Sequence, residues 1–234
     1  MPTKPPPSRS RTQYGVPSDV KAIRDKIREF LDGETDGGRV GNCQYGVYVF
    51  YDYDAEPIYV GQTYETLRQR IGRHLTNQRT DAVAMNVLDP FEVAEIEVWP
   101  CWNLVGKKVN KKKAKAELNA VEYAVFEKVL NSSTFGAVLN EKDVPAATKI
   151  ALPKSHRQRI IPDALFEGRK HPDVRIARRA STIANLARVI SERKVSAGLR
   201  KTLLTQARRL ERLAAERLKD FANEIPARKR GEQE

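Results

Sequence analysis

The chain has 234 residues, of which 42 are Lys or Arg and 30 are Asp or Glu, giving a net charge of +12 with 40% hydrophobic residues. This hydrophobic content supports a folded core and excludes a wholly disordered chain. No apolar run approaches the roughly 18 residues of a membrane-spanning helix, so we expect no membrane span. The length suits one domain with extensions, or two small domains.

The first 17 residues are rich in proline and contain no apolar core of a signal peptide, so they predict a disordered leader. Cys43 and Cys101 are the only cysteines, which is too few for a disulfide framework. Neither has the Cys/His spacing of a zinc site, so both are predicted to be structural. Together these features favour a cytoplasmic protein.

The positive charge is concentrated in the last third of the chain. Residues 1–153 hold 21 basic and 20 acidic residues, net +1, whereas residues 154–234 hold 21 and 10, net +11. Such a segment attracts polyanions, of which nucleic acid is the commonest in a cytoplasm and an anionic membrane surface the weaker alternative.

A helix and a loop are predicted over residues 18–40, from apolar residues at helical spacing that end at Gly33. The run Tyr45–Tyr53 is dense in aromatic and β-branched residues, and Ile58–Val60 resumes this pattern after a turn. Two such runs separated by a turn predict a β-hairpin.

The next three elements follow from periodicity. Thr66–Leu75 has helical spacing, Glu92–Val98 alternates as a half-buried strand, and Ala116–Leu130 is a second helix after a lysine-rich loop. A short extended piece ends at Asn140. The order β-β-α-β-α over residues 41–143 predicts a small α+β domain with a short antiparallel sheet.

Beyond this domain, residues 144–173 contain four prolines and predict an irregular linker. Residues 174–225 predict a basic helical hairpin, followed by a tail over 226–234. Ile176, Ile183 and Ile190 are seven residues apart, so we expect them to be buried against the domain or in a homodimer.

Polar residues that carry chemistry follow these elements in a fixed order. The sequence has Gly46-Val47-Tyr48, Tyr59-Val60-Gly61, Arg70 with His74 four residues later, Glu122 and Asn140. Each tripeptide alone is a weak signal, but five elements in this order on these predicted structures are strong. The pattern resembles the GIY-YIG nuclease superfamily over residues 41–143.

The resemblance implies an endonuclease that hydrolyses a phosphodiester. It implies that Tyr48 orients or deprotonates the attacking water, that Arg70 binds the scissile phosphate, and that Tyr59 orders water or phosphate. His74 would hydrogen-bond Tyr48 or share its proton. A phenol with a pKa of about 10 is a poor base at neutral pH, so we expect positive charge from Arg70 to lower the pKa of Tyr48. Ordinary aromatic packing is the alternative for both tyrosines.

The resemblance also implies that Glu122 holds one divalent cation, Mg²⁺, with Mn²⁺ as a substitute. On a wheel of about 100° per residue Glu122 lies about 40° from Leu118, in the apolar stripe, whereas Glu127 lies about 180° away. A carboxylate in that position needs a partner or a metal. The alternative is an ion pair with Arg70. Asn140 matches the bracing asparagine of the family, although its long spacing from Glu122 leaves Asn131 as an alternative.

Contacts with DNA are predicted at three places. Gly46 and Gly61 would let the DNA backbone approach the strands, a twist or bulge of the strands being the alternative. The lysine-rich loop and the helical hairpin would contact phosphates along the DNA backbone. The alternative is that their charged side chains only form solvent-exposed surface. The residues predicted to bind phosphates are Lys107, Lys108, Lys111, Lys112, Lys113, Lys115, Arg178 and Arg179.

The leading interpretation is therefore an Mg²⁺-dependent DNA endonuclease without a small-molecule cofactor. The alternative is a non-catalytic nucleic-acid-binding protein on the same scaffold, with the C-terminal hairpin mediating dimerisation. The sequence leaves open whether the role is restriction or other defence, repair or recombination, because one fold serves many functions.

Overall fold

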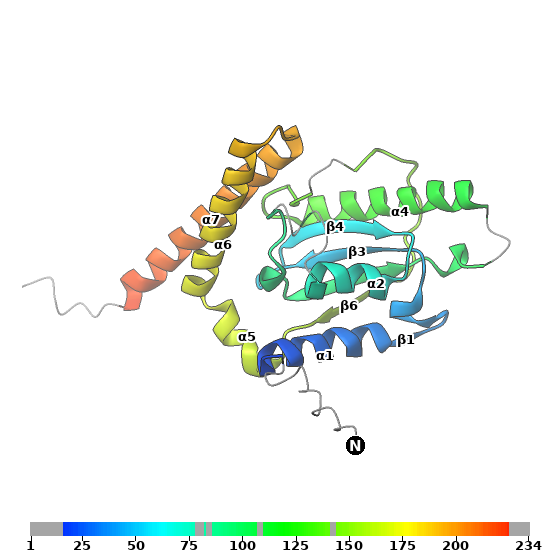
Figure 1. Cartoon of the computed structure of the whole chain (residues 1–234), viewed down its shortest axis with the longest axis horizontal. Helices are drawn as coiled ribbons and strands as arrows, with labels where there is room; N and C mark the ends of the chain where they lie inside the picture. The colour runs from blue at the N-terminus through cyan, green and yellow to red at the C-terminus, as the bar shows by residue number, and fades with distance from the viewer. Residues whose placement is uncertain (1–15, 78–81, 83–85, 107–109, 141–143, 225–234) are drawn as a thin grey trace, which may run out of the picture.

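The computed structural model shows an α+β protein with a central sheet between layers of helices (Figure 1). Among the residues described, no helix is long and apolar enough to cross a membrane. The terminal segments predicted as a leader and a tail lie largely outside the described residues. The structure describes residues 16–77, 82, 86–106, 110–140 and 144–224.

The main sheet is antiparallel and has the strand order β4-β3-β5-β6. The predicted hairpin forms β3 (Gly46–Tyr51) and β4 (Pro57–Thr63), and β5 (Glu95–Pro100) pairs with the other edge of β3. A separate small hairpin, β1 (Glu34–Thr35) with β2 (Gly38–Arg39), lies in the loop before β3.

The central strand β3 is buried along its whole length, because helices cover both faces of the sheet. Tyr48 and Phe50 belong to the core on one face, and Val47 and Val49 belong to the core on the other. Alternate residues of a strand point to opposite faces, so one aromatic and β-branched run supplies both cores.

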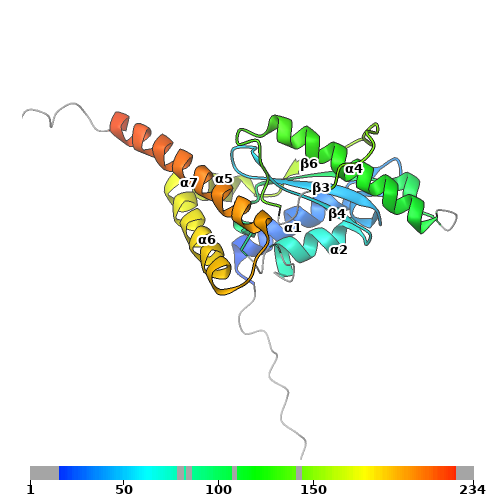
Figure 2. The same cartoon turned by 90° about the horizontal axis from the view of Figure 1, so that it is seen from above.

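The helices divide between the two faces of the sheet (Figures 1 and 2). The first face carries α1 (Ser18–Asp32) and α2 (Leu67–Gly72), and α2 continues into the π-helical turn η2 (Arg73–Asn77). The second face carries α4 (Lys111–Ser132), whose buried residues include Leu118 and Val125. Three 3-10 turns complete the domain: η1 (Val40–Asn42), η3 (Pro90–Glu92) and η4 (Trp102–Leu104).

The segment predicted as an irregular linker contains regular structure instead. Residues His156–Arg159 form β6, which pairs with β5 and completes the sheet, and Asp163–Lys170 form α5. The sequence of β6 is His-Arg-Gln-Arg, with no apolar alternation, so its strand conformation comes from pairing with the open edge of β5. The prediction of irregular structure here was wrong.

The predicted helical hairpin forms α6 (Pro172–Glu192) and α7 (Ala197–Glu224), which lie at one end of the sheet (Figure 2). Its buried face differs from the predicted isoleucine repeat. Ile190 is buried, but Ile176 and Ile183 are only partly so. The most deeply buried positions of α6 include two arginines and four other residues: Arg175, Arg179, Thr182, Leu186, Val189 and Ile190.

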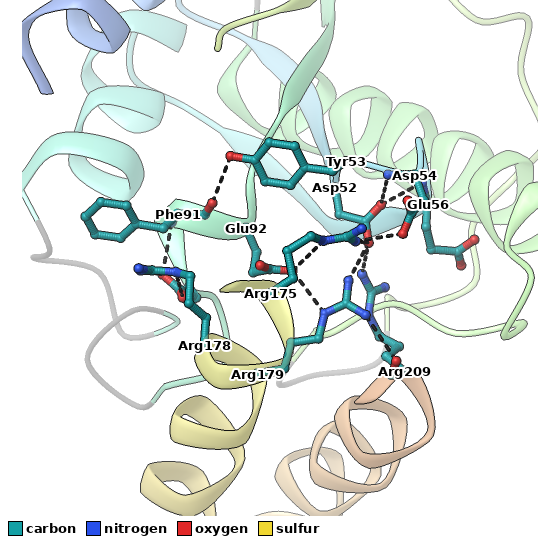
Figure 3. Close-up of polar contacts among 11 residues, drawn as sticks. Asp52, Tyr53, Asp54, Glu56, Phe91, Glu92, Arg175, Arg178, Arg179 and Arg209 are labelled. Carbon is teal, nitrogen blue, oxygen red and sulfur yellow. Dashed lines mark hydrogen bonds and ion pairs between the residues drawn. The ribbon is translucent and has the colours of Figure 1, made fainter. Parts of the chain in front are cut away.

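A buried ionic cluster joins the hairpin to the domain, and its centre is Asp52 at the end of β3 (Figure 3). Asp52 Oδ2 accepts hydrogen bonds from Arg175 at 3.1 Å, Arg179 at 2.8 Å and Arg209 at 2.6 Å. Its other oxygen, Oδ1, accepts from the backbone N–H groups of Asp54 and Glu56 in the β3–β4 turn. One carboxylate therefore both shapes the turn and fixes two helices.

A second carboxylate, that of Glu92, shares this positive charge. Arg179 Nε donates to Glu92 Oε2 at 3.0 Å, and Asp54 accepts from Arg175 at 2.7 Å. Burial raises the pKa of Glu92, although Arg179 and Arg175 oppose this effect. Removing one partner from a buried ion pair leaves an uncompensated charge, which costs about 3–5 kcal/mol.

We therefore predict that Asp52→Asn lowers the free energy of unfolding by about 3–5 kcal/mol, because three buried guanidinium groups lose their common acceptor. Urea unfolding followed by circular dichroism measures this change. Asp25→Asn is the matched control: Asp25 pairs with Lys21 and Arg28 on the surface of α1, so its substitution should leave stability unchanged. Equal effects of the two substitutions would contradict the role assigned to Asp52.

Candidate active site

The candidate site is organised around the hydroxyl of Tyr48, which is fully buried in β3. Arg70 Nε donates a hydrogen bond to Tyr48 Oη at 3.1 Å, and His74 Nε2 lies 2.8 Å from the same oxygen. The structure thus brings together three of the residues predicted from the sequence. A hydroxyl can donate once and accept twice, so Tyr48 Oη retains one acceptor position.

Arg70 and His74 reach Tyr48 because of the local geometry of α2 and η2. Thr66 and Gln69 form a capping box that starts α2 directly after the β4 loop. Arg70 lies in the last turn of α2, and His74 lies in the π-helical turn that follows. Irregular turns of this kind often occur at functional sites.

The charges in the site set the protonation of these groups. Burial, together with Arg70 and Arg73, lowers the pKa of His74 to about 3. His74 is therefore neutral at physiological pH. Because Arg70 Nε already donates a hydrogen bond to Tyr48 Oη, we infer that the hydroxyl proton of Tyr48 points to His74 Nε2.

The expected lowering of the Tyr48 pKa is opposed by its burial. Desolvation of the phenol, followed by the effect of Tyr59, raises the pKa of Tyr48, and Arg70 only partly offsets this. A buried group favours its neutral form. In the free protein Tyr48 is consequently a neutral phenol, which can accept a hydrogen bond but is no phenolate base.

Tyr59 in β4 belongs to the same aromatic cluster. Its ring centroid lies 6.3 Å from that of Tyr48 and 5.2 Å from that of His74. Tyr59 also interacts with Arg70 through its hydroxyl. Four of the predicted residues, Tyr48, Tyr59, Arg70 and His74, therefore form one contiguous group.

The two motif glycines are required for packing, which differs from the predicted DNA contact. Gly61 lies opposite Tyr48 in the sheet, and a Cβ there would be 2.4 Å from Tyr48 Oη. A Cβ on Gly46 would lie 3.0 Å from the Leu67 side chain of α2. Both glycines are buried, so protein side chains occupy the space where DNA was expected.

Asn140 braces the outer edge of β4. Its Oδ1 accepts from Val60 N at 3.1 Å, and its Nδ2 donates to Val60 O at 2.8 Å. The amide thus replaces a neighbouring strand at the residue between Tyr59 and Gly61. Asn131, the alternative from the sequence, is exposed at the end of α4.

Glu122 extends from α4 and is half-buried. The carboxylate lies close enough to Tyr48 and Tyr64 to raise the pKa values of both phenols. It has no hydrogen-bond or ion-pair partner among the described residues, and the ion pair with Arg70 that was considered as an alternative is not formed. Burial raises the pKa of Glu122 to about 7.

The lysine-rich run was predicted as a loop, but α4 begins within it. Asn110 caps the helix, and the lysines that follow lie in its exposed first turns. Lys107 and Lys108 lie outside the described residues. Lysines at a helix N-terminus are unfavourable for the helix dipole. The exposed lysines of α4 are Lys111, Lys112, Lys113 and Lys115.

The two hairpin arginines predicted to bind DNA have internal partners. Arg179 is 4% exposed and bonded to Asp52 and Glu92, so it is not available to phosphate. Arg178 is half-exposed, donates to both carboxylate oxygens of Asp89, and lies over the Phe91 ring at 4.0 Å. The prediction for Arg179 was wrong because its charge is used inside the fold.

Sequence reasoning missed three polar residues beside Arg70. Asn119 Oδ1 on α4 accepts from Gln62 Nε2 at 3.0 Å and from the Tyr64 hydroxyl at 3.3 Å. Gln62, Tyr64 and Arg70 line an open pocket of about 400 Å³ together with Thr63 and Glu65. The signal in the sequence that could have identified Gln62 and Tyr64 was their position within three residues after the motif glycine, Gly61.

The fold and this constellation define a small α+β domain in which an arginine and a histidine contact one buried tyrosine hydroxyl. Residues 44–128 match the family model described as the GIY-YIG catalytic domain. This segment of the chain is therefore similar to the catalytic domain of the GIY-YIG family. Asn140 and the C-terminal hairpin lie outside the matched segment. No curated protein and no solved structure matches the chain.

We predict that Gly61→Ala destabilises the protein by about 1–3 kcal/mol, because the added methyl group meets the buried Tyr48 ring. Thermal or urea unfolding measures the loss. Gly168→Ala in α5 is the matched control: no heavy atom lies within 4 Å of its added Cβ, so this substitution should be neutral or stabilising. A neutral Gly61→Ala would contradict the close packing of Tyr48 on Gly61.

We predict a pH-dependent stability difference between the wild type and Glu122→Gln. Because the folded-state pKa of Glu122 is about 7 against an ordinary 4.5, the folded protein favours the protonated acid. The wild type should therefore lose up to about 3 kcal/mol relative to Glu122→Gln as pH rises from about 4.5 to about 7, with no further loss above it. Parallel stability curves across this range, measured by urea unfolding in EDTA, would contradict the raised pKa.

Proposed function

We propose that this protein is a divalent-metal-dependent endonuclease that hydrolyses DNA, with Mg²⁺ as the ion and Mn²⁺ as a substitute. The observation that carries the proposal is the Tyr48 hydroxyl held between Arg70 and His74, with the unpaired Glu122 carboxylate nearby. These groups together match what phosphodiester hydrolysis needs: a position for water and charge for the phosphoryl oxygens.

The donors present suit Mg²⁺ rather than a metal held in an all-protein cage. Glu122 provides a single carboxylate, and its raised pKa means that it lacks a compensating positive charge. The described residues include no cluster of three or more His, Cys, Asp or Glu side chains that could hold a metal. Mg²⁺ is typically bound by one or two carboxylates, substrate phosphates and water. When bound, the ion stabilises negative charge on the phosphate and on the leaving oxygen.

The chain's own residues can order and deprotonate the attacking water. Tyr48 Oη has one acceptor position left. Because Tyr48 is fully buried, the side chains around it must move for the attacking water to donate a hydrogen bond there. As the water oxygen bonds to phosphorus, a water proton passes to Tyr48 and the Tyr48 proton passes to His74 Nε2. The P–O3′ bond breaks with its electron pair on O3′, which takes a proton from a solvent water. The low pKa of His74 opposes this transfer in the free protein. A negative phosphate close to Arg70 would make a protonated His74 less unfavourable.

The surface of α4 offers a path for the DNA backbone. At about 100° per residue, Lys111, Lys115, Asn119 and Glu122 lie within about 80° of one another along one stripe. The two lysines are exposed, so phosphates bound along the stripe would lead to Glu122. Such contacts supply affinity that is independent of sequence and sensitive to salt.

The direct test is nicking of supercoiled plasmid by the purified protein with Mg²⁺, with Mn²⁺ and with EDTA. We expect nicking with either ion and none with EDTA. Glu122→Ala should bind DNA as the wild type does but lose at least about 100-fold in cleavage rate, since it removes charge stabilisation that acts in the transition state.

Glu127→Ala is the matched control on the same helix. Glu127 accepts a hydrogen bond from Tyr123 and pairs with Lys149, apart from the Tyr48 group, so this variant should cleave normally. Full cleavage by Glu122→Ala would contradict the metal role of Glu122. DNA binding by the wild type without cleavage under any of these ions would favour the non-catalytic binding protein instead.

A further inference from the structure

We propose that the pocket beside Arg70 is a nucleobase seat, in which Tyr64 stacks on the base next to the scissile phosphate. This inference rests on the proposed function and assigns a substrate-contacting role to a residue outside the Tyr48 group. The pocket lies between the end of β4 and the start of α2, and Tyr64 and Arg70 both line it.

Tyr64 is exposed but held in place. Its side chain is 44% exposed, although its hydroxyl donates to Asn119 Oδ1 at 3.3 Å. The ring of Tyr45 is perpendicular to that of Tyr64, with centroids 6.4 Å apart. A perpendicular contact occupies at most one face of the Tyr64 ring. An aromatic ring fixed at two points loses little conformational entropy when a ligand stacks on it.

Gln62, which lines the pocket, also has a buried acceptor without a partner in the described part of the chain. Gln62 Nε2 donates to Asn119, whereas Gln62 Oε1 is buried and has no hydrogen-bond partner among the described residues. A buried acceptor without a partner is unfavourable, and a donor from a ligand would remove this cost. The edges of nucleobases carry N–H donors next to a flat π-face, so one base can satisfy Gln62 and cover Tyr64.

Arg70 connects this seat to the reaction. It donates to Tyr48 in the catalytic group and lines the pocket as well. A phosphate bound by Arg70 carries its own nucleoside, whose base then lies at the pocket. The Glu122 carboxylate raises the pKa of Tyr64 as it does that of Tyr48, which places both phenols near the same charge. Aromatic stacking accepts every base, so the seat favours an unstacked nucleotide over a particular sequence.

The test uses Tyr64→Leu, which removes the aromatic face, and Tyr64→Phe, which keeps it. Binding to a fluorescein-labelled single-stranded oligonucleotide is measured by anisotropy in EDTA, and cleavage is measured with Mg²⁺ on a substrate whose cut ends are mapped. We expect Tyr64→Leu to weaken binding and kcat/KM about 10-fold and Tyr64→Phe to change either by less than about 3-fold. Phe221→Leu, at an exposed aromatic on α7, is the control and should behave as the wild type.

An abasic substrate gives a second readout. Removing the base next to the mapped cut, or any single base in the binding assay, should cost the wild type about as much as Tyr64→Leu costs, and should cost Tyr64→Leu little more. Unchanged binding and cleavage by Tyr64→Leu would contradict base stacking on Tyr64 without contradicting the proposed nuclease activity. A wild type that never cuts, with Tyr64→Leu still binding more weakly, would overturn the nuclease and leave the seat.

Discussion

The structure depends on one constraint: β3 is buried on both faces, so each of its polar side chains must find a partner inside the protein. The Tyr48 hydroxyl is paired with Arg70 and His74. Tyr51 donates to the buried Glu97 of β5 at 2.6 Å. Asp52, directly after the strand, accepts hydrogen bonds from three arginines of the C-terminal hairpin. The partners of this one strand thus fix the positions of α2 with η2, of β5 and of the C-terminal hairpin.

This constraint changes the meaning of the chain's charge. Most of the excess positive charge lies in residues 154–234, which suggested that this segment grips DNA. Arg175, Arg179 and Arg209 of that segment are at most 4% exposed and pair with the Asp52 carboxylate of the α+β domain. The exposed lysines of α4 lie instead in the part of the chain with nearly balanced charge, on the helix that carries Glu122. The position of a basic side chain in the fold, rather than the net charge of its segment, therefore decides whether it can contact a substrate.

The sequence predicted the fold of residues 41–140 well, because its signals were local. Aromatic and β-branched runs gave β3 and β4, and the Arg-x-x-x-His spacing placed Arg70 and His74 together. It did not predict β6, whose polar sequence forms a strand only by pairing with β5. It also missed Asp52, because the three arginines that bind it lie more than 120 residues away in the chain. Long-range pairing of charges leaves no periodic pattern in a sequence.

The sequence predicted which residues form the candidate site but not the direction in which their pKa values shift. Motif order identified Tyr48, Tyr59 and Arg70, whereas burial of the phenol reversed the expected shift of the Tyr48 pKa. The glycines illustrate the same limit: Gly61 is needed because the Tyr48 ring passes over it, a contact across two strands. Residue identity reveals the groups that are available, and the surrounding packing determines their protonation and access.

The site depends on the Tyr48 hydroxyl being held between the Arg70 donor and a neutral His74 acceptor. Nitrogen-15 NMR of the His74 imidazole in EDTA tests it most directly. This arrangement predicts a neutral ring with its proton on Nδ1 from pH 5 to pH 8, since the pKa of His74 is about 3, and a changed Nε2 shift in Tyr48→Phe. A ring that titrates near its ordinary pKa of 6.5, or that carries its proton on Nε2, would contradict it.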